Sequence, residues 1–215
     1  MRTLVLAAAI AAALPALQGC FPVIATGAAV TAVSAADRRT TGAQVDDQGI
    51  ELRAERALTD RIPPIKAAIA VVSYNRRALL IGQVASEDVK QEATRIVQGI
   101  TNVREVINEL EVAGGTGFGT KANDTYITGK VKASLVEANN VPAATIKVKT
   151  ERGTVYLMGL VTDAEGQRAA QVAAGVSGVI RVVKVFEPLS ASDIERLNTA
   201  PTPAPASAET APVSQ

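Results

Sequence analysis

One segment of the chain groups the side chains that best suit contact with a lipid surface. From residue 124 to 137, apolar side chains recur at helical spacing and predict the face that packs on a core: Ile127, Val131 and Leu135. Other positions bring an aromatic ring and lysines to a different face, and the candidate lipid-binding residues are Thr125, Tyr126, Gly129, Lys130, Lys132, Ala133 and Val136. An aromatic ring at headgroup depth and ammonium groups facing anionic lipid are typical of binding at a membrane surface.

A less specific explanation fits the same helix face. In that explanation the face is an ordinary solvated one, and Tyr126 packs on a neighbouring domain. A lysine near an anionic surface contributes about 1 kcal/mol, so Lys130 and Lys132 give only weak, reversible recruitment. The residues alone leave both explanations open.

The only cysteine, Cys20, is the candidate site of lipid attachment. Arg2 and the apolar run at 4–14 have the form of a secretion signal, because the run is shorter than the roughly 20 apolar residues that span a bilayer. The ending Leu17-Gln18-Gly19-Cys20 resembles the lipobox of bacterial lipoproteins, which implies removal of residues 1–19 and diacylation of Cys20. Phe21, in place of Asp, implies by the same resemblance transport to the outer membrane. The alternative is an ordinary signal peptide with a chance cysteine.

Catalytic chemistry has little support in the sequence. The chain contains no His, which is the commonest general base and the commonest metal ligand. The acidic groups Asp46-Asp47, Glu87-Asp88 and Asp163 with Glu165 are explained by helix N-termini, where carboxylates cap the backbone and meet the positive end of the helix dipole. We therefore predict a protein that is not an enzyme, with no catalytic residues, no cofactor and no metal site.

The charge balance argues against nucleic acid as a partner. The whole chain carries a formal net charge of +1, whereas nucleic-acid binding relies on an excess of Lys and Arg. Residues 46–112 hold 9 Lys and Arg against 11 Asp and Glu, and residues 122–189 hold 8 against 6. The second half is therefore the better candidate for an anionic membrane.

Two apolar stretches repeat and reveal how the chain is organised. The sequence RALLIGQV at 77–84 matches TVYLMGLV at 154–161, with Gly82 and Gly159 at the same place in each. Each copy contains a helical pattern, two β-rich runs around a short turn, a second helical pattern and a last β-rich run. This order predicts an α+β fold of two tandem domains, each a three-stranded mixed sheet with two helices on one face (αββαβ). For the two glycines we favour close backbone packing or a bulge over a ligand site.

The repeat divides the chain into six parts. Residues 1–19 are the signal peptide and 20–44 the lipidated N-terminus and spacer; the domains cover 45–113 and 122–190, joined by a Gly-rich linker at 114–121. Residues 191–215, rich in Pro, Ala, Ser and Thr, are predicted to be a disordered tail, with at most a helical turn at 193–197. We also expect first helices that begin at Asp46 and Asp124, and a solvent-facing Lys147 and Lys149.

The helix–hairpin–helix–strand repeat with these glycines resembles the BON domain family. The resemblance covers about residues 20–186, and its sharpest segments are QVDD at 44–47, NDT at 123–125, IT at 127–128, KVKTE at 147–151 and MGLVT at 158–162. Two such domains behind a lipobox resemble the dual-BON outer-membrane lipoproteins. The resemblance implies a non-enzymatic lipoprotein on the periplasmic face of the outer membrane, which binds anionic phospholipid through its second BON domain. It also implies roles in outer-membrane integrity, at the division site and with the β-barrel assembly machinery.

Two features depart from the family pattern. Tyr126 stands where the resemblance leads one to expect Trp, and the Pro-rich tail after Ser190 has no counterpart. The alternative function is that of a protein-interaction adaptor for envelope or β-barrel assembly machinery, without specific lipid binding.

Overall fold

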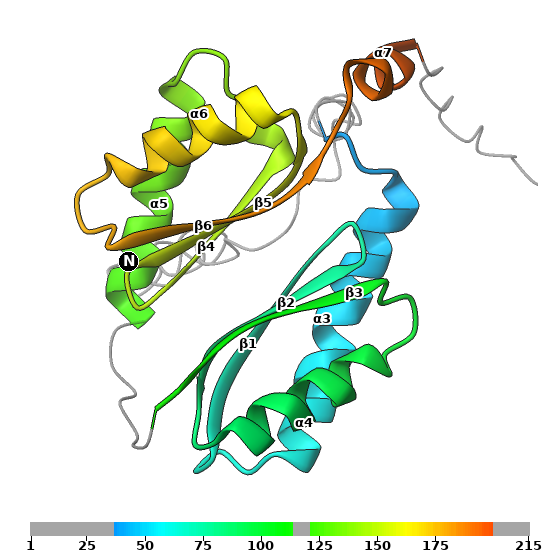
Figure 1. The fold of residues 1–215 in the computed structure, drawn as a ribbon, viewed down its shortest axis with the longest axis vertical. Helices are drawn as coiled ribbons and strands as arrows, with labels where there is room; N and C mark the ends of the chain where they lie inside the picture. Colours follow the sequence, from blue (N-terminus) through cyan, green and yellow to red (C-terminus); the bar gives the residue numbers. More distant parts are fainter. Residues whose placement is uncertain (1–36, 114–120, 200–215) are drawn as a thin grey trace, which may run out of the picture. The chain divides into compact units, whose positions relative to one another are not determined.

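The computed structural model describes residues 37–113 and 121–199, which lie in one compact unit, and shows the same arrangement twice (Figure 1). The first domain consists of α3 (Thr41–Arg61), β1 (Ala67–Tyr74), β2 (Arg77–Val84), α4 (Glu87–Gln98) and β3 (Glu105–Val112). The second consists of α5 (Lys121–Glu137), the 3-10 turn η2 (Ala143–Thr145), β4 (Ile146–Glu151), β5 (Thr154–Val161), α6 (Asp163–Ala174) and β6 (Arg181–Pro188). The helix α7 (Ala191–Thr199) follows. The predicted fold class and αββαβ order are confirmed.

Each domain has a three-stranded sheet with its second strand in the centre. In the first sheet β1 runs antiparallel to β2, and β2 runs parallel to β3 after the α4 crossover; β4, β5 and β6 repeat this pattern. The hairpin turns Asn75-Arg76 and Arg152-Gly153 have positive φ at both positions, the conformation of a tight type I′ turn.

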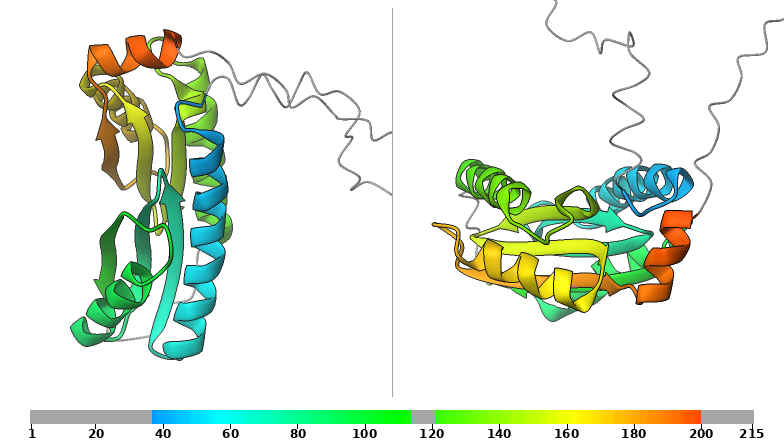
Figure 2. Two further views of the ribbon diagram at one scale, coloured as in Figure 1. Left: turned by 90° about the vertical axis from the view of Figure 1, so that its right-hand side faces the viewer. Right: turned by 90° about the horizontal axis from the view of Figure 1, so that it is seen from above.

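The helices cover one face of each sheet, as predicted. Figure 2 shows α3 running alongside β1, and α4 lies against β3; α5 and α6 lie in the same way against β4 and β6. The inward positions predicted for the first helices are buried in both domains: Ile50, Ala54 and Leu58, and Ile127, Val131 and Leu135. Helical periodicity therefore identified the packed face of both helices correctly.

The central strands β2 and β5 are mostly apolar because both of their faces are largely buried. Every residue of β5 is buried, and its side chains alternate between two cores. Leu157 packs with the helices of the second domain, whereas Met158 packs with residues of the first domain's sheet such as Leu79 and Ile81. A strand buried on both faces has apolar residues at nearly every position. This explains why the repeated stretch is apolar in both copies.

The starts of the helices differ from our prediction. α3 begins at Thr41, because the Thr40 hydroxyl accepts a hydrogen bond from the Ala43 N–H at 3.1 Å, so residues assigned to the spacer form its first turn. Asp46 and Asp47 lie inside this helix and do not cap it. α5 begins at Lys121, before Asp124.

The region predicted as a disordered tail begins with a helix. α7 occupies Ala191–Thr199, and residues 200–215 lie outside the described residues. Ser190 and Asp193 stabilise its start by reciprocal hydrogen bonds: the Ser190 N–H donates to the Asp193 carboxylate at 2.9 Å, and the Asp193 N–H donates to the Ser190 hydroxyl at 3.2 Å. The helical turn that we allowed at 193–197 therefore lies within a longer helix, which starts two residues earlier.

Close backbone packing explains both repeated glycines, as we favoured. A Cβ on Gly82 would lie 2.0 Å from the Ala68 carbonyl oxygen, and one on Gly159 would lie 2.8 Å from the Thr145 carbonyl oxygen. Gly82 also has φ +117°, which a residue with a side chain rarely adopts.

Candidate lipid-contact surface

The outward side of α5 carries the predicted lipid-binding residues. Tyr126 is 66% exposed and Val136 is 73% exposed, while Ile127 and Val131 on the opposite side are buried. We use the name α5 outer face for the exposed residues Thr125, Tyr126, Gly129, Lys132, Ala133 and Val136. The alternative in which Tyr126 packs on the neighbouring domain is wrong, because the ring lies mostly in solvent.

Lys130 borders the α5 outer face and is held in place. Its ammonium group donates a hydrogen bond to the Ser177 carbonyl oxygen in the segment between α6 and β6. The same ammonium lies 4.8 Å from the centroid of the Tyr126 ring, within cation–π range. Lys130 therefore orients Tyr126 and joins α5 to the α6–β6 segment, in addition to supplying positive charge.

A buried carboxylate fixes α5 to the sheet. Asp124 accepts hydrogen bonds from the N–H groups of Arg152 at 2.8 Å and Gly153 at 2.9 Å, both in the β4–β5 turn. The Thr128 and Thr150 hydroxyls form a second link at 2.7 Å. Because turn N–H groups at positive φ have no strand partner, the carboxylate satisfies donors that burial would otherwise make costly.

The first domain has an equivalent buried carboxylate, Asp47, whose role we misinterpreted from the sequence. Asp47 is 2% exposed and accepts from the N–H groups of Asn75 at 2.8 Å and Arg76 at 2.7 Å, in the β1–β2 turn. Asp47 and Asp124 each precede a buried Ile by three residues, so the repeat itself carried the signal. We had explained both aspartates by helix capping, although they stand 77 positions apart, at the offset of the repeat.

The sheet faces that the helices leave uncovered pack against each other. Val72 and Tyr74 of the first domain share one apolar cluster with Tyr156, Leu160 and other residues of the second. The Tyr74 hydroxyl donates to the Thr145 carbonyl oxygen at 2.8 Å, and burial raises the pKa of Tyr74 to about 12. The α5 outer face is not part of this interface, so it stays accessible while the domains are joined.

Lys147 does not face solvent as we expected. Its ammonium pairs with the Glu51 carboxylate of α3 at 2.6 Å and donates to the Ser73 carbonyl oxygen at 3.0 Å. Lys149, two residues later on β4, is exposed as expected. Pairing removes Lys147 from the charges free to meet a membrane.

An arginine just before α3 joins the two domains through a bidentate ion pair. Both terminal nitrogens of Arg38 donate to the Glu165 carboxylate of α6 at 2.8 Å, and Arg38 also donates to the Leu160 carbonyl oxygen at 3.0 Å. The hydrogen bond from Arg38 holds the pKa of Glu165 at about 2, well below its ordinary value of 4.5. The end of the segment assigned to the spacer is therefore part of the folded unit.

We expect this ion pair to give the protein an acid-sensitive component of stability. A carboxylate whose pKa is lowered by folding stabilises the folded state fully above its unfolded pKa, and the contribution is lost as the pH falls through the folded pKa. For Glu165 the loss falls between about pH 4.5 and about pH 2. Arg38→Gln keeps the helix cap made by Thr162 and Glu165 but removes the pair, so its unfolding midpoint should approach that of wild type over this range. Chemical denaturation of both proteins from pH 6 to pH 2 measures the difference, and a constant difference would contradict the expectation.

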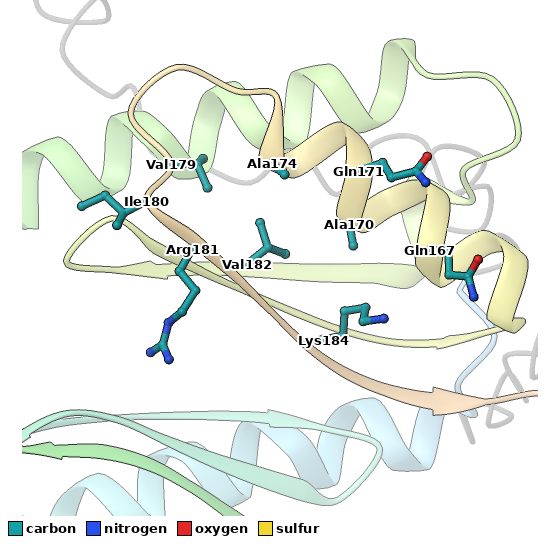
Figure 3. Close-up of a pocket in the computed structure, with 9 residues that line it drawn as sticks. All are labelled: Gln167, Ala170, Gln171, Ala174, Val179, Ile180, Arg181, Val182 and Lys184. Carbon is teal, nitrogen blue, oxygen red and sulfur yellow. The ribbon is translucent and has the colours of Figure 1, made fainter.

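A cavity of about 550 Å³ lies between α6 and β6 (Figure 3). Gln167 and Gln171 of α6 line it together with small apolar side chains, and Lys184 of β6 lines the other side. None of the predicted site residues lines it.

Two kinds of feature are absent from the described residues. Within 37–113 and 121–199, no group of three His, Cys, Asp or Glu residues could hold a metal ion. None of the helices in that part of the chain is long and apolar enough to cross a membrane. Cys20 lies outside the described residues, so the lipidation prediction stays untested.

A family model, that of the BON domain, matches residues 46–114 and 123–187, which together cover most of both αββαβ units. This chain belongs to the BON-domain family. The first helices of both BON domains begin a few residues before the matched ranges.

Among curated proteins, the chain is 42% identical over 173 residues to the outer membrane lipoprotein DolP of Haemophilus influenzae, covering 80% of this chain and 89% of the relative. It is 37% identical over 151 residues to a 21 kDa hemolysin of Actinobacillus pleuropneumoniae, covering 70% and 78% of the two chains. It is 32% identical over 138 residues to the osmotically-inducible protein Y of Escherichia coli, covering 63% and 69%.

Proposed function

We propose that this BON-domain protein is an outer-membrane lipoprotein that binds anionic phospholipid through the α5 outer face. The observation that carries the proposal is the 66% exposed Tyr126 ring, oriented by Lys130 on a helix whose other side is fixed to the sheet. A rigid helix with an exposed aromatic ring and adjacent lysines loses little conformational freedom when it meets headgroups. The name of the Haemophilus relative, an outer membrane lipoprotein, supports the location.

The N-terminus supports attachment to the membrane. In the proposal, residues 1–19 are removed, Cys20 is acylated, and the protein faces the periplasm without enzymatic activity. Acyl chains contribute about 0.8 kcal/mol per buried methylene, so a diacylated Cys20 supplies the anchor while α5 supplies the preference for anionic lipid. Support for outer-membrane integrity and recruitment to the division site follow as proposals from that preference.

Vesicle binding tests the role of the α5 outer face. The chain from Ala35 onward is suitable because it keeps all the described residues, 37–113 and 121–199, which lie in one compact unit. With phosphatidylglycerol vesicles we expect backbone amide shifts concentrated in residues 125–136 and binding about tenfold weaker for Tyr126→Ala. Lys132→Gln should weaken binding about fivefold, the effect of removing about 1 kcal/mol of charge attraction. Lys132 is the better charge variant because Lys130 also holds the α6–β6 segment.

Phosphatidylcholine vesicles and Lys66→Gln, at an exposed lysine of the first domain, are the controls. Equal binding to both vesicle types, or equal losses for Lys132→Gln and Lys66→Gln, would contradict a specific anionic surface on α5. Photo-crosslinking from position 133 in cells addresses the adaptor alternative. A single dominant protein product there, including a component of the β-barrel assembly machinery, would favour the adaptor.

A further inference from the structure

Ile180, in the segment between α6 and β6, is the most exposed large apolar side chain of the described residues, at 82%. Figure 3 shows it at the end of the α6–β6 cavity, pointing away from the other labelled side chains. No sequence pattern predicted its exposure. Exposure alone decides little, because Ile65 is 78% exposed as well, so the case for Ile180 depends on what surrounds it.

Three contacts hold the Ile180 segment against α5 and the β4–β5 turn. The Ile180 N–H donates to the Gly153 carbonyl oxygen at 2.8 Å, and the Ser177 carbonyl oxygen accepts from Lys130. Gly178 has φ +97°, and a Cβ there would lie 3.2 Å from the Ile127 side chain. The backbone that carries Ile180 is therefore held in place. Its segment is hydrogen-bonded to Lys130, the lysine that orients Tyr126.

The surroundings of Ile180 are basic. Arg152 is exposed at the tip of the β4–β5 turn, and Arg181 follows Ile180 with its side chain 53% exposed. Glu111 lies 3.7 Å from Arg181 and offsets part of its charge. Asp124, the acidic group bound to this turn, is buried with its oxygens occupied by turn N–H groups. An apolar side chain flanked by two arginines, one of them partly offset by Glu111, complements an anionic bilayer surface.

We propose that Ile180, flanked by Arg152, is a second membrane anchor, which contacts anionic phospholipid beside the α5 outer face. The proposal rests on the proposed function of the α5 outer face and extends it to two further elements, the α6–β6 segment and the β4–β5 turn. A single helix that lies on a membrane is free to roll about its axis. A second contact beside Lys130 fixes the roll and thereby the orientation of the whole domain on the bilayer.

Partitioning onto phosphatidylglycerol vesicles tests the second anchor. With the chain from Ala35 onward, Ile180→Ser should bind about tenfold more weakly than wild type, which corresponds to about 1.4 kcal/mol. Ile180→Leu should retain binding. The matched control is Ile65→Ser, which removes a 78% exposed isoleucine from the turn between α3 and β1 of the first domain and should leave binding unchanged. Unfolding midpoints and amide spectra of all variants check that each is folded.

The outcomes separate this inference from the proposed function. If wild type binds, Tyr126→Ala weakens binding and Ile180→Ser does not, the second anchor is wrong while the α5 outer face stands. Equal losses for Ile65→Ser and Ile180→Ser would also overturn the second anchor, because any exposed apolar side chain would then suffice. If wild type does not distinguish phosphatidylglycerol from phosphatidylcholine, both proposals fail.

Discussion

Asp47→Ala should destabilise the first BON domain by about 3 kcal/mol or more, which is the usual cost of removing one partner from a buried ion pair. The carboxylate accepts four hydrogen bonds of 2.7–2.8 Å, from the N–H groups of Asn75 and Arg76, the Ser73 hydroxyl and the Arg39 guanidinium. Alanine leaves the turn donors without this acceptor, and Arg39 loses one of its two carboxylate partners and keeps Asp37 and the Tyr74 ring. Denaturant unfolding followed by circular dichroism measures the loss.

Asp46→Ala and Asp124→Ala are the comparisons for this prediction. Asp46 pairs on the surface with Arg76 and Asn102, so its loss should change stability much less than the loss of Asp47. Asp124 accepts hydrogen bonds from two turn N–H groups, and its removal should cost about 1–3 kcal/mol. Faster amide exchange at Asn75 and Arg76 would assign the Asp47 effect to the turn. Similar costs for Asp46→Ala and Asp47→Ala would show that the turn does not depend on this carboxylate.

The buried carboxylates also connect the fold to the candidate site. Asp124 holds the start of α5 against the β4–β5 turn, one residue before the α5 outer face begins at Thr125. The same turn receives the Ile180 N–H through Gly153. A single carboxylate therefore positions both proposed membrane anchors, Tyr126 and Ile180, relative to one sheet.

Local sequence patterns predicted the elements of each domain but not the contacts between domains. The apolar period of α5 identified its buried and exposed faces because helix geometry repeats every 3.6 residues. No local pattern shows that Lys147 reaches Glu51 or that Arg38 reaches Glu165, since those partners are 96 and 127 positions apart. The nearly continuous apolar run of β5 was the sequence signal that both faces of its sheet are covered. We used that run only to recognise the repeat.

The sequence predicted one part of the candidate site, the α5 outer face, but not Ile180. The α5 outer face followed from the period of one helix, whereas Ile180 depends on how a separate segment folds against that helix. The hydrogen bond from Lys130 to Ser177 spans 47 positions, and no spacing rule predicts it. The Gly-Val-Ser-Gly-Val-Ile sequence at 175–180 gave a turn signal but no direction for the isoleucine.

The glycines provide the second large effect, and two of them should respond with opposite sign. Gly82→Ala should destabilise the first domain by more than about 3 kcal/mol, because the new Cβ would lie 2.0 Å from the Ala68 carbonyl oxygen at a φ of +117°. Gly129→Ala meets no atom within 4 Å on the α5 outer face and should stabilise the protein by up to about 1 kcal/mol, since alanine favours the helix interior. Gly159→Ala should fall between them, because its clash distance is 2.8 Å without a positive φ. Thermal and denaturant unfolding of the three variants measure the order. A destabilised Gly129→Ala would show that this glycine serves packing, and would weaken the case that the α5 outer face is free to meet a membrane.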